Sequence, residues 1–236
     1  MVITLRDHRL DLEGMARAIT PLTKLVFIAN PNNPTATIVT AAEIERFMAG
    51  IPPTVIVVFD EAYIEFAMGP DFPDSLAYVR QGRKVFVLRT FSKASSLAGL
   101  RVGYGIAQDD AMALLHRIRQ PFNVNSLAQV AALAALEDDS HILECVRMNE
   151  AGRHFLYDEF TALGLKYVPS RANFILLDVG RSASEVYQRL LREGVIVRPM
   201  TSFGMETALR ITVGTPEENR RLVKALRKCL EEVRGA

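Results

Sequence analysis

Three apolar segments, each followed by polar residues, constrain the fold of this chain more than any other feature. They are KLVFIA, TVIVVF and KVFVLR, at residues 24–29, 54–59 and 84–89. Each is short and apolar on both faces, and helical patterns lie between them, which is typical of buried parallel strands in an α/β sheet. A fourth strand is predicted at VGYGIA, residues 102–107. We therefore predict an α/β fold with a mostly parallel sheet.

A second, smaller α+β domain is predicted in the C-terminal part of the chain. A long helix is expected from about Ser140 to Leu163, and shorter strands and helices follow it. The predicted strands are residues 173–179, 195–198 and 209–213, and the predicted helices are Ala183 to Arg192 and Pro216 to Val233. We place the large-domain portion at residues 1–145 and the small domain at residues 146–236.

The composition excludes several classes of function. A formal charge of +1 over 236 residues gives no basic surface for nucleic acid or a membrane. The four histidines and two cysteines show no ligand spacing, so we expect no metal site. The apolar segment from Leu127 to Leu136 is too short to span a bilayer, and no signal peptide is visible. A soluble, cytoplasmic protein is therefore expected.

The polar residues after the three apolar segments predict a ligand pocket. NPNNPT follows the first segment, DEAY the second and TFSK the third. Ligands of open parallel sheets bind outside the carboxyl ends of the strands, where these residues are expected to meet. Each residue alone has a simpler explanation: Asn33 as a turn former, Asp60 as a helix cap, Tyr63 as core and Lys93 as a solvated charge. Their order at matching strand ends favours the pocket.

An amine and a carboxylate in one such pocket suit pyridoxal phosphate chemistry. The cofactor aldehyde needs a lysine for a Schiff base, and that lysine must be partly neutral to attack and to move protons. The pyridine nitrogen needs an anionic partner, since a protonated ring withdraws electrons from the substrate. Lys93 and a buried Asp60 are predicted to supply these two groups.

The remaining polar residues match the other groups of the cofactor. Its ring hydroxyl accepts hydrogen bonds from an amide and a phenol, for which Asn33 and Tyr63 are the candidates. Its phosphate calls for hydroxyl donors and a guanidinium. We expect Thr90, Ser92 and Arg101 to provide them.

These motifs, with the LAGLRVGYG that follows TFSK, resemble those of fold-type-I aminotransferases. Within that group they are most similar to the histidinol-phosphate aminotransferases and their aromatic-amino-acid relatives. The resemblance continues through ANFILLD, GVIVRPM and LRITVGTPEEN, at residues 172–178, 194–200 and 209–219. It implies pyridoxal 5'-phosphate as cofactor, a large and a small domain, a small-molecule amino donor with a 2-oxo acid, and a homodimer.

The resemblance also implies roles for individual residues. Lys93 would bind the cofactor aldehyde, with Asp60 at the ring nitrogen and Tyr63 among the catalytic groups. Arg210 matches the arginine that grips the anionic group of the substrate, although an outward strand charge is the alternative. Arg198 is a candidate to assist it, and Asn33 is placed near the substrate as well. The implied reaction is transamination of histidinol phosphate with 2-oxoglutarate or glutamate.

Two departures from the family pattern affect these expectations. Ala36 stands where the family usually has glycine, which costs about 1 kcal/mol if that position needs a positive φ. The chain also begins later than its relatives and looks like the later two-thirds of such an enzyme. An aromatic aminotransferase, a phospho-amino-acid decarboxylase of the same fold, and an inactive fragment or assembly module stay open as alternatives.

Overall fold

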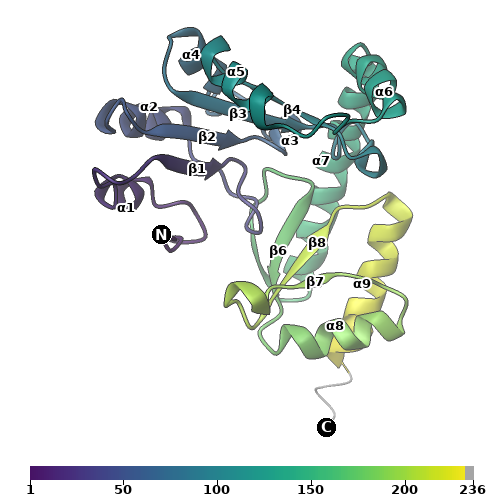
Figure 1. Ribbon diagram of the computed structural model, residues 1–236. Helices are drawn as coiled ribbons and strands as arrows, with labels where there is room; N and C mark the ends of the chain where they lie inside the picture. Colours follow the sequence, from purple (N-terminus) through teal and green to yellow (C-terminus); the bar gives the residue numbers. More distant parts are fainter. Residues whose placement is uncertain (232–236) are drawn as a thin grey trace. The chain divides into compact units, whose positions relative to one another are not determined.

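The computed structural model describes residues 1–231 and divides into two compact units (Figure 1). The first unit comprises Met1–Asn32 and Thr37–Leu143. The second takes the short segment Asn33–Ala36 together with the chain from Glu144 onward. The loop that follows the first strand therefore belongs to both units. Each unit is described by itself below.

The first unit is built on a mixed sheet of four strands. These are β1 (Leu25–Ala29), β2 (Ile56–Asp60), β3 (Val85–Thr90) and β4 (Gly103–Ile106), in that spatial order. β1, β2 and β3 run parallel, whereas β4 is antiparallel to β3. The predicted α/β class with a mostly parallel sheet is thus confirmed.

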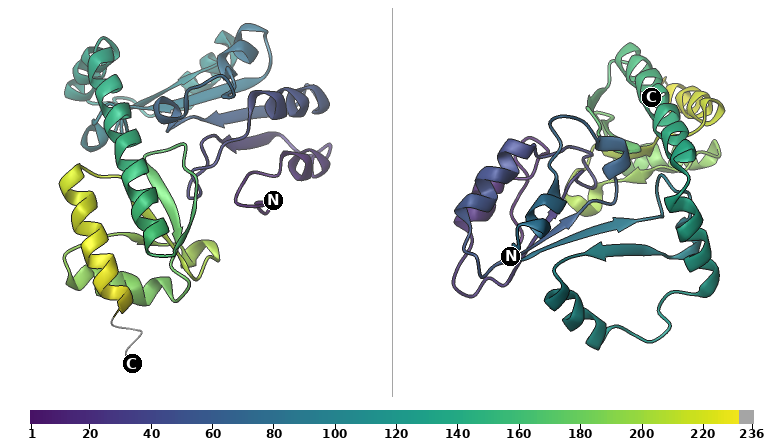
Figure 2. Two further views of the ribbon diagram at one scale, coloured as in Figure 1. Left: turned by 180° about the vertical axis from the view of Figure 1, so that it is seen from behind. Right: turned by 90° about the horizontal axis from the view of Figure 1, so that it is seen from above.

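Short helices connect and follow these strands. They are α1 (Leu12–Arg17), α2 (Ala41–Gly50), α3 (Ile64–Ala67), α4 (Ser75–Arg80), the 3₁₀ turn Ala98–Leu100, α5 (Asp109–Ile118) and α6 (Ser126–Leu136). α2 begins with a capping box, in which the Thr40 hydroxyl and the Glu43 carboxylate each accept a backbone N–H of the other residue. α1 and α2 lie side by side (Figure 2).

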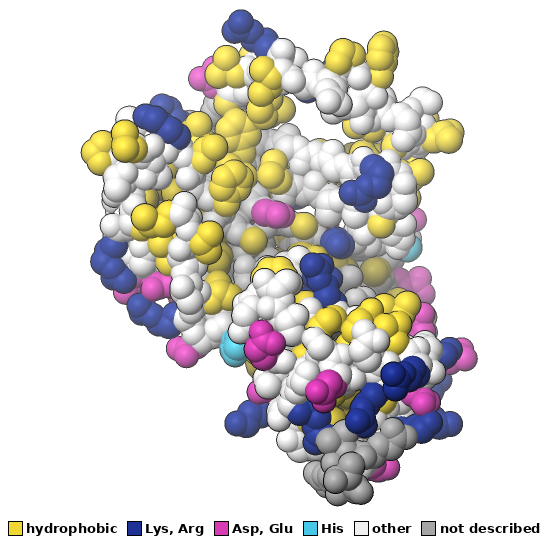
Figure 3. All heavy atoms as spheres, turned by 60° about the horizontal axis from the view of Figure 1, so that its bottom comes forward, with side chains coloured by type: hydrophobic (Ala, Val, Ile, Leu, Met, Phe, Trp, Pro, Cys, Tyr) yellow, Lys and Arg dark blue, Asp and Glu magenta, His cyan; other side chains and the backbone are white. Residues whose placement is uncertain are grey.

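The two faces of this sheet differ in their burial. Alternate strand residues, such as Ile28, Phe59 and Val87, pack in one core with side chains of α1, α2 and α4. The residues between them point to the other face, where Phe27 is 63% exposed and Leu88 is 39% exposed. Hydrophobic side chains are correspondingly visible on the molecular surface (Figure 3). The pleat therefore separates a core face from an open face.

The second unit contains an antiparallel sheet with helices packed on it. Its strands are β5 (Lys166–Val168), β6 (Phe174–Asp178), β7 (Arg198–Pro199) and β8 (Ala208–Thr212), in the spatial order β5-β6-β8-β7. Its helices are α7 (Asp139–Ala162, which begins in the first unit), α8 (Ala183–Arg192), the 3₁₀ turn Thr201–Phe203 and α9 (Pro216–Glu231). Leu156, Leu177 and Leu226 are fully buried in the core between these elements.

Some predicted boundaries differ from the observed ones. The strand predicted at residues 195–198 is reduced to Arg198–Pro199, because only these two residues pair with β8. Ile196 is 81% exposed despite its β-branched side chain, so an apolar run was a misleading signal there. The predicted helix end at Val233 lies outside the described residues. Among the described helices, none is both long and apolar enough to cross a membrane.

The loop after β1 is closed by the buried side chain of Asn30. Its Nδ2 donates to the Val39 carbonyl and its Oδ1 accepts the Val39 N–H, both at 3.0 Å. A second closure joins the Asn32 N–H to the Thr37 carbonyl at 2.8 Å. These bonds fix the base of the loop that contains Asn33.

We predict that Asn30→Ala destabilises the protein by about 2–4 kcal/mol, because it leaves the buried N–H and carbonyl of Val39 without their hydrogen-bond partner. Chemical denaturation measures the free energy of unfolding. Asn123→Ala, at an exposed position, is the matched control and should change stability by less than about 0.5 kcal/mol. Equal effects of the two substitutions would contradict the role assigned to Asn30.

Candidate active site

Asp60 is the last residue of β2 and lies on the open face of the sheet. It stands opposite Ala29 of β1 and Leu88 of β3 in the parallel ladders. Its Oδ1 accepts the N–H of Ala62 at 3.1 Å. The expectation that Asp60 is buried was wrong, because the pleat places it on the same face as the exposed Leu88.

Lys93 and Tyr63 come together beyond the ends of β3 and β2. The Lys93 Nζ lies 5.0 Å from the centroid of the Tyr63 ring, within the range of a cation–π contact. Tyr63 precedes α3 and is 8% exposed. The turn that carries Lys93 is held by its carbonyl, which accepts the Ser96 N–H at 3.0 Å. The structure thus brings one amine and one phenol into contact.

The three predicted phosphate-binding residues lie around the turn between β3 and β4. Thr90 ends β3, and its Oγ1 accepts the Ser92 N–H at 3.1 Å. Arg101 has a φ of 56° and donates from Nη1 to the Ala98 carbonyl at 2.7 Å. Gly103 pairs with Thr90, and a Cβ there would lie 2.8 Å from the Arg89 carbonyl. Only glycine therefore allows β4 to approach β3 this closely.

The predicted substrate-binding residues occupy the second unit. The Arg210 Nη1 donates to the Asn33 Oδ1 at 2.7 Å, and the guanidinium lies 5.0 Å from the Phe174 ring centroid. Arg198 stands directly opposite Arg210 in the β7–β8 ladder, so both side chains project from one face of the sheet. The Arg198 guanidinium lies 5.9 Å from the Phe203 ring centroid. Asn33, Arg198 and Arg210 thus form one polar group within this unit.

Sequence reasoning missed a buried ion pair next to Asp60 and Thr90. Glu61 is 1% exposed, and its Oε2 accepts from both the Nε and the Nη2 of Arg89 at 2.9 Å. Neither residue was assigned a role from the sequence. The available signal was the period-two pattern, since Glu61 follows Phe59, and Arg89 follows Val87, on the core face.

One buried and one half-buried carboxylate in this region, Glu61 and Glu65, have raised pKa values. Burial raises the pKa of Glu61, although the Ser75 hydroxyl and the Arg89 guanidinium act to lower it. Burial also raises the pKa of Glu65, and the neighbouring Glu61 carboxylate adds to the rise. The Glu65 Oε2 is buried without a hydrogen-bond partner. Glu65 is therefore the less well compensated of the two.

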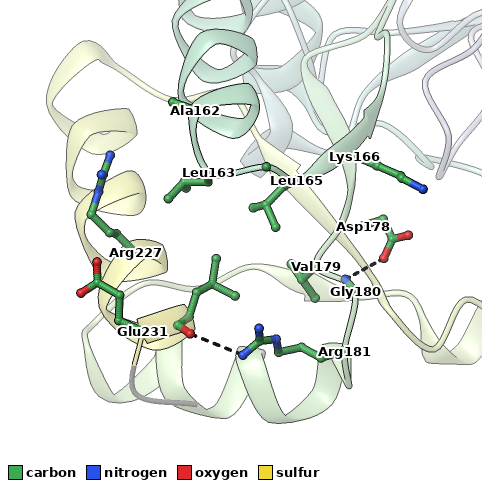
Figure 4. Close-up of a pocket in the computed structure, with 12 residues that line it drawn as sticks. Ala162, Leu163, Leu165, Lys166, Asp178, Val179, Gly180, Arg181, Arg227 and Glu231 are labelled. Carbon is green, nitrogen blue, oxygen red and sulfur yellow. Dashed lines mark hydrogen bonds between the residues drawn. The ribbon is translucent and has the colours of Figure 1, made fainter. Parts of the chain in front are cut away.

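A cavity of about 600 Å³ lies elsewhere, in the second unit (Figure 4). Lys166, Asp178 and Arg181 line it, and the Arg181 Nη1 donates to the Leu230 carbonyl at 3.5 Å. Its lining includes none of the predicted site residues. Over the described part of the chain, no group of three or more His, Cys, Asp or Glu side chains is arranged to hold a metal ion.

The fold matches that of pyridoxal-phosphate-dependent aminotransferases. The model of the family described as "Aminotransferase class I and II" matches residues 2–226. The chain belongs to this family.

Several similar proteins carry a more specific name. A histidinol-phosphate aminotransferase of Moorella thermoacetica is 53% identical over 226 residues, which cover 95% of this chain and 58% of that protein. The structure of histidinol-phosphate aminotransferase from Sinorhizobium meliloti, in complex with pyridoxal 5'-phosphate, matches with a TM-score of 0.92 at 29% identity. It covers 99% of this chain and 65% of that one. A putative histidinol-phosphate aminotransferase from Erwinia carotovora atroseptica also matches with a TM-score of 0.92, at 30% identity over 98% of this chain and 68% of that one. The chain thus spans about three-fifths of the length of the curated relatives it matches.

We predict that Glu65→Gln raises the stability of the protein at neutral pH. A carboxylate whose pKa is raised in the folded state contributes stability that is lost as pH rises above its unfolded pKa, about 4.3. The gain should therefore grow from pH 4 to pH 7, and chemical denaturation across this range measures it. Glu144→Gln, at an exposed position, is the control. A uniform effect of Glu65→Gln at all pH values would contradict this explanation.

Proposed function

We propose that this chain binds pyridoxal 5'-phosphate and acts in the transamination of histidinol phosphate with 2-oxoglutarate or glutamate. The observation that carries the proposal is the contact of the Lys93 amine with the Tyr63 phenol at the strand ends where Asp60 and Thr90 also lie. Membership of the aminotransferase family supports the reaction type. The names of its relatives support the substrate.

The groups in the first unit fit the cofactor one by one. Lys93 offers an amine to the aldehyde, and Asp60, on the open face, offers a carboxylate to the ring nitrogen. Tyr63 offers a phenol to the ring hydroxyl. Ser92 and Arg101, with Thr90 beside them, offer donors to the phosphate. Each of the four polar parts of the cofactor therefore has a candidate partner in this unit.

The cofactor supplies an electron-withdrawing ring that stabilises negative charge at the substrate Cα. The residues of this chain supply the proton transfers and the orientation. The Lys93 Nζ would remove the proton from the substrate Cα, and the Tyr63 ring beside it would restrict the position of the amine. Asp60 would keep the ring nitrogen protonated.

The second unit would bind the anionic group of the substrate. Arg210 is oriented by its hydrogen bond to Asn33 and by the Phe174 ring below its guanidinium. Arg198, on the same face of the sheet, is the candidate to assist it. A phosphate or a carboxylate suits the planar guanidinium of either residue. We also propose that the protein acts as a homodimer, which sedimentation equilibrium would test.

We predict that borohydride reduction in the presence of pyridoxal phosphate attaches the cofactor to Lys93. Peptide mass spectrometry should find the adduct in the unaltered protein and lose it in Lys93→Ala. Lys84→Ala, an exposed lysine at the start of β3, is the matched control and should retain it. An unaltered protein without any adduct on Lys93 would favour the inactive-fragment alternative.

We predict that Arg210→Gln raises the KM for histidinol phosphate at least about tenfold, since hydrogen bonds to a charged group contribute roughly 1.5–3 kcal/mol. Arg192→Gln, an exposed arginine of α8, should leave KM unchanged. Steady-state assays with histidinol phosphate, phenylalanine and threonine phosphate separate the proposed reaction from the aromatic and decarboxylase alternatives. A ranking in which histidinol phosphate comes last would reject the proposed substrate.

A further inference from the structure

The Glu61–Arg89 ion pair occupies a distinctive place in the chain. Glu61 directly follows Asp60, and Arg89 directly precedes Thr90 of the TFSK segment. Both side chains lie on the core face, whereas Asp60 and Thr90 alternate to the open face. The pair therefore lies behind the proposed cofactor site and is separated from it by one layer of backbone.

This pair connects β2 and β3 at the point where their ladder ends. The last paired residues are Asp60 and Leu88, and the Glu61 N–H donates to the Leu88 carbonyl at 2.9 Å. Beyond this bond, β2 leads into α3, while β3 continues for two residues paired with β4. The Glu61 carboxylate and the Arg89 guanidinium bridge the two strands where they start to diverge.

The chemistry of the pair suits a positioning role better than a stabilising one. A buried ion pair is often no more stable than apolar residues of similar size, because removing both charges from water offsets their attraction. Here one carboxylate oxygen accepts both guanidinium N–H groups, and Oε1 is buried without a hydrogen-bond partner. The Glu61 carboxylate is thus incompletely compensated, while its bonds to Arg89 restrict the direction of both side chains.

We propose that Glu61 and Arg89 are positioning residues of the proposed active site. Their ion pair holds the end of β2, which carries Asp60, at a fixed spacing from the end of β3, which leads to Lys93. The cofactor ring would contact the Asp60 carboxylate and the Lys93 amine at the same time. It would therefore bind tightly only when the two strand ends keep their spacing. The role in cofactor binding rests on the proposed function. The restraint that the pair places on the strand ends is independent of the proposed function.

The test is to replace both charges by apolar side chains of similar size, in Glu61→Leu/Arg89→Met. We expect the midpoint of thermal unfolding to stay within a few degrees of the unaltered protein or to rise. Amide hydrogen exchange of the cofactor-free protein should become about tenfold faster at Ser96 and Leu97, whose N–H groups donate to the Lys93 and Phe91 carbonyls, and stay unchanged in α2. The dissociation constant of pyridoxal phosphate, measured by absorbance titration, should rise about tenfold.

The single substitutions Glu61→Leu and Arg89→Met complete a double-mutant cycle with this double variant. Their effects on cofactor affinity should be far from additive, since each alone removes the same restraint. Glu13→Gln/Arg17→Gln, in an exposed pair of the same unit with a 3.8 Å separation, is the control and should change neither exchange nor affinity.

The outcomes separate this proposal from the proposed function. Unchanged exchange at the strand ends of the stable double variant would overturn the positioning role, whether or not the cofactor binds. Exchange that quickens throughout the unit with a large fall in unfolding temperature would overturn it too, because it would show a merely structural pair. An unaltered protein that binds no cofactor would reject the proposed function, while the exchange measurement would still decide whether the pair restrains the strand ends.

Discussion

The parallel pairing of β2 with β3 is the constraint on which the rest of the first unit depends. Its register sets Asp60 opposite Leu88, so that the carboxylate and the turn after Thr90 emerge at one edge of the sheet. The same pairing brings Tyr63 and Lys93, each three residues past a strand end, into contact. Three residues after each strand are enough for this contact. The chain turns directly after Asp60 and after Thr90 and does not extend either strand.

Local signals in the sequence predicted most of this arrangement. The apolar segments identified the strands, because this signal depends on residues a few positions apart. The contact of Arg210 with Asn33 joins residues 177 positions apart and has no local signal. The exposure of Asp60 also escaped prediction. It depends on which face of the sheet is covered, and a strand that is apolar on both faces does not reveal this.

Ala36 shows how a departure from a sequence pattern is tolerated. Its φ is 59°, which lies in the left-handed region, so alanine costs about 1 kcal/mol relative to glycine at this position. Ala36 is also fully buried, and a buried methyl group contributes roughly 0.8 kcal/mol relative to glycine. The two effects are of similar size and opposite sign. The loop can therefore retain its left-handed residue, and Asn33 its bond to Arg210, without glycine at this position.

The two consecutive acids Asp60 and Glu61 illustrate how one strand end can serve two tasks. The pleat directs Asp60 to the open face and Glu61 to the core face, where the Arg89 guanidinium meets it. Because Arg89 is directed at Glu61, its positive charge does not pair with Asp60 across the sheet. A shift of one residue in the β2 register would exchange the two carboxylates and bury Asp60 against Arg89. The ion pair alone does not exclude this shift, because either acid could meet Arg89. The apolar core residues Val57 and Phe59 exclude it, and with their register the ion pair leaves Asp60 on the open face.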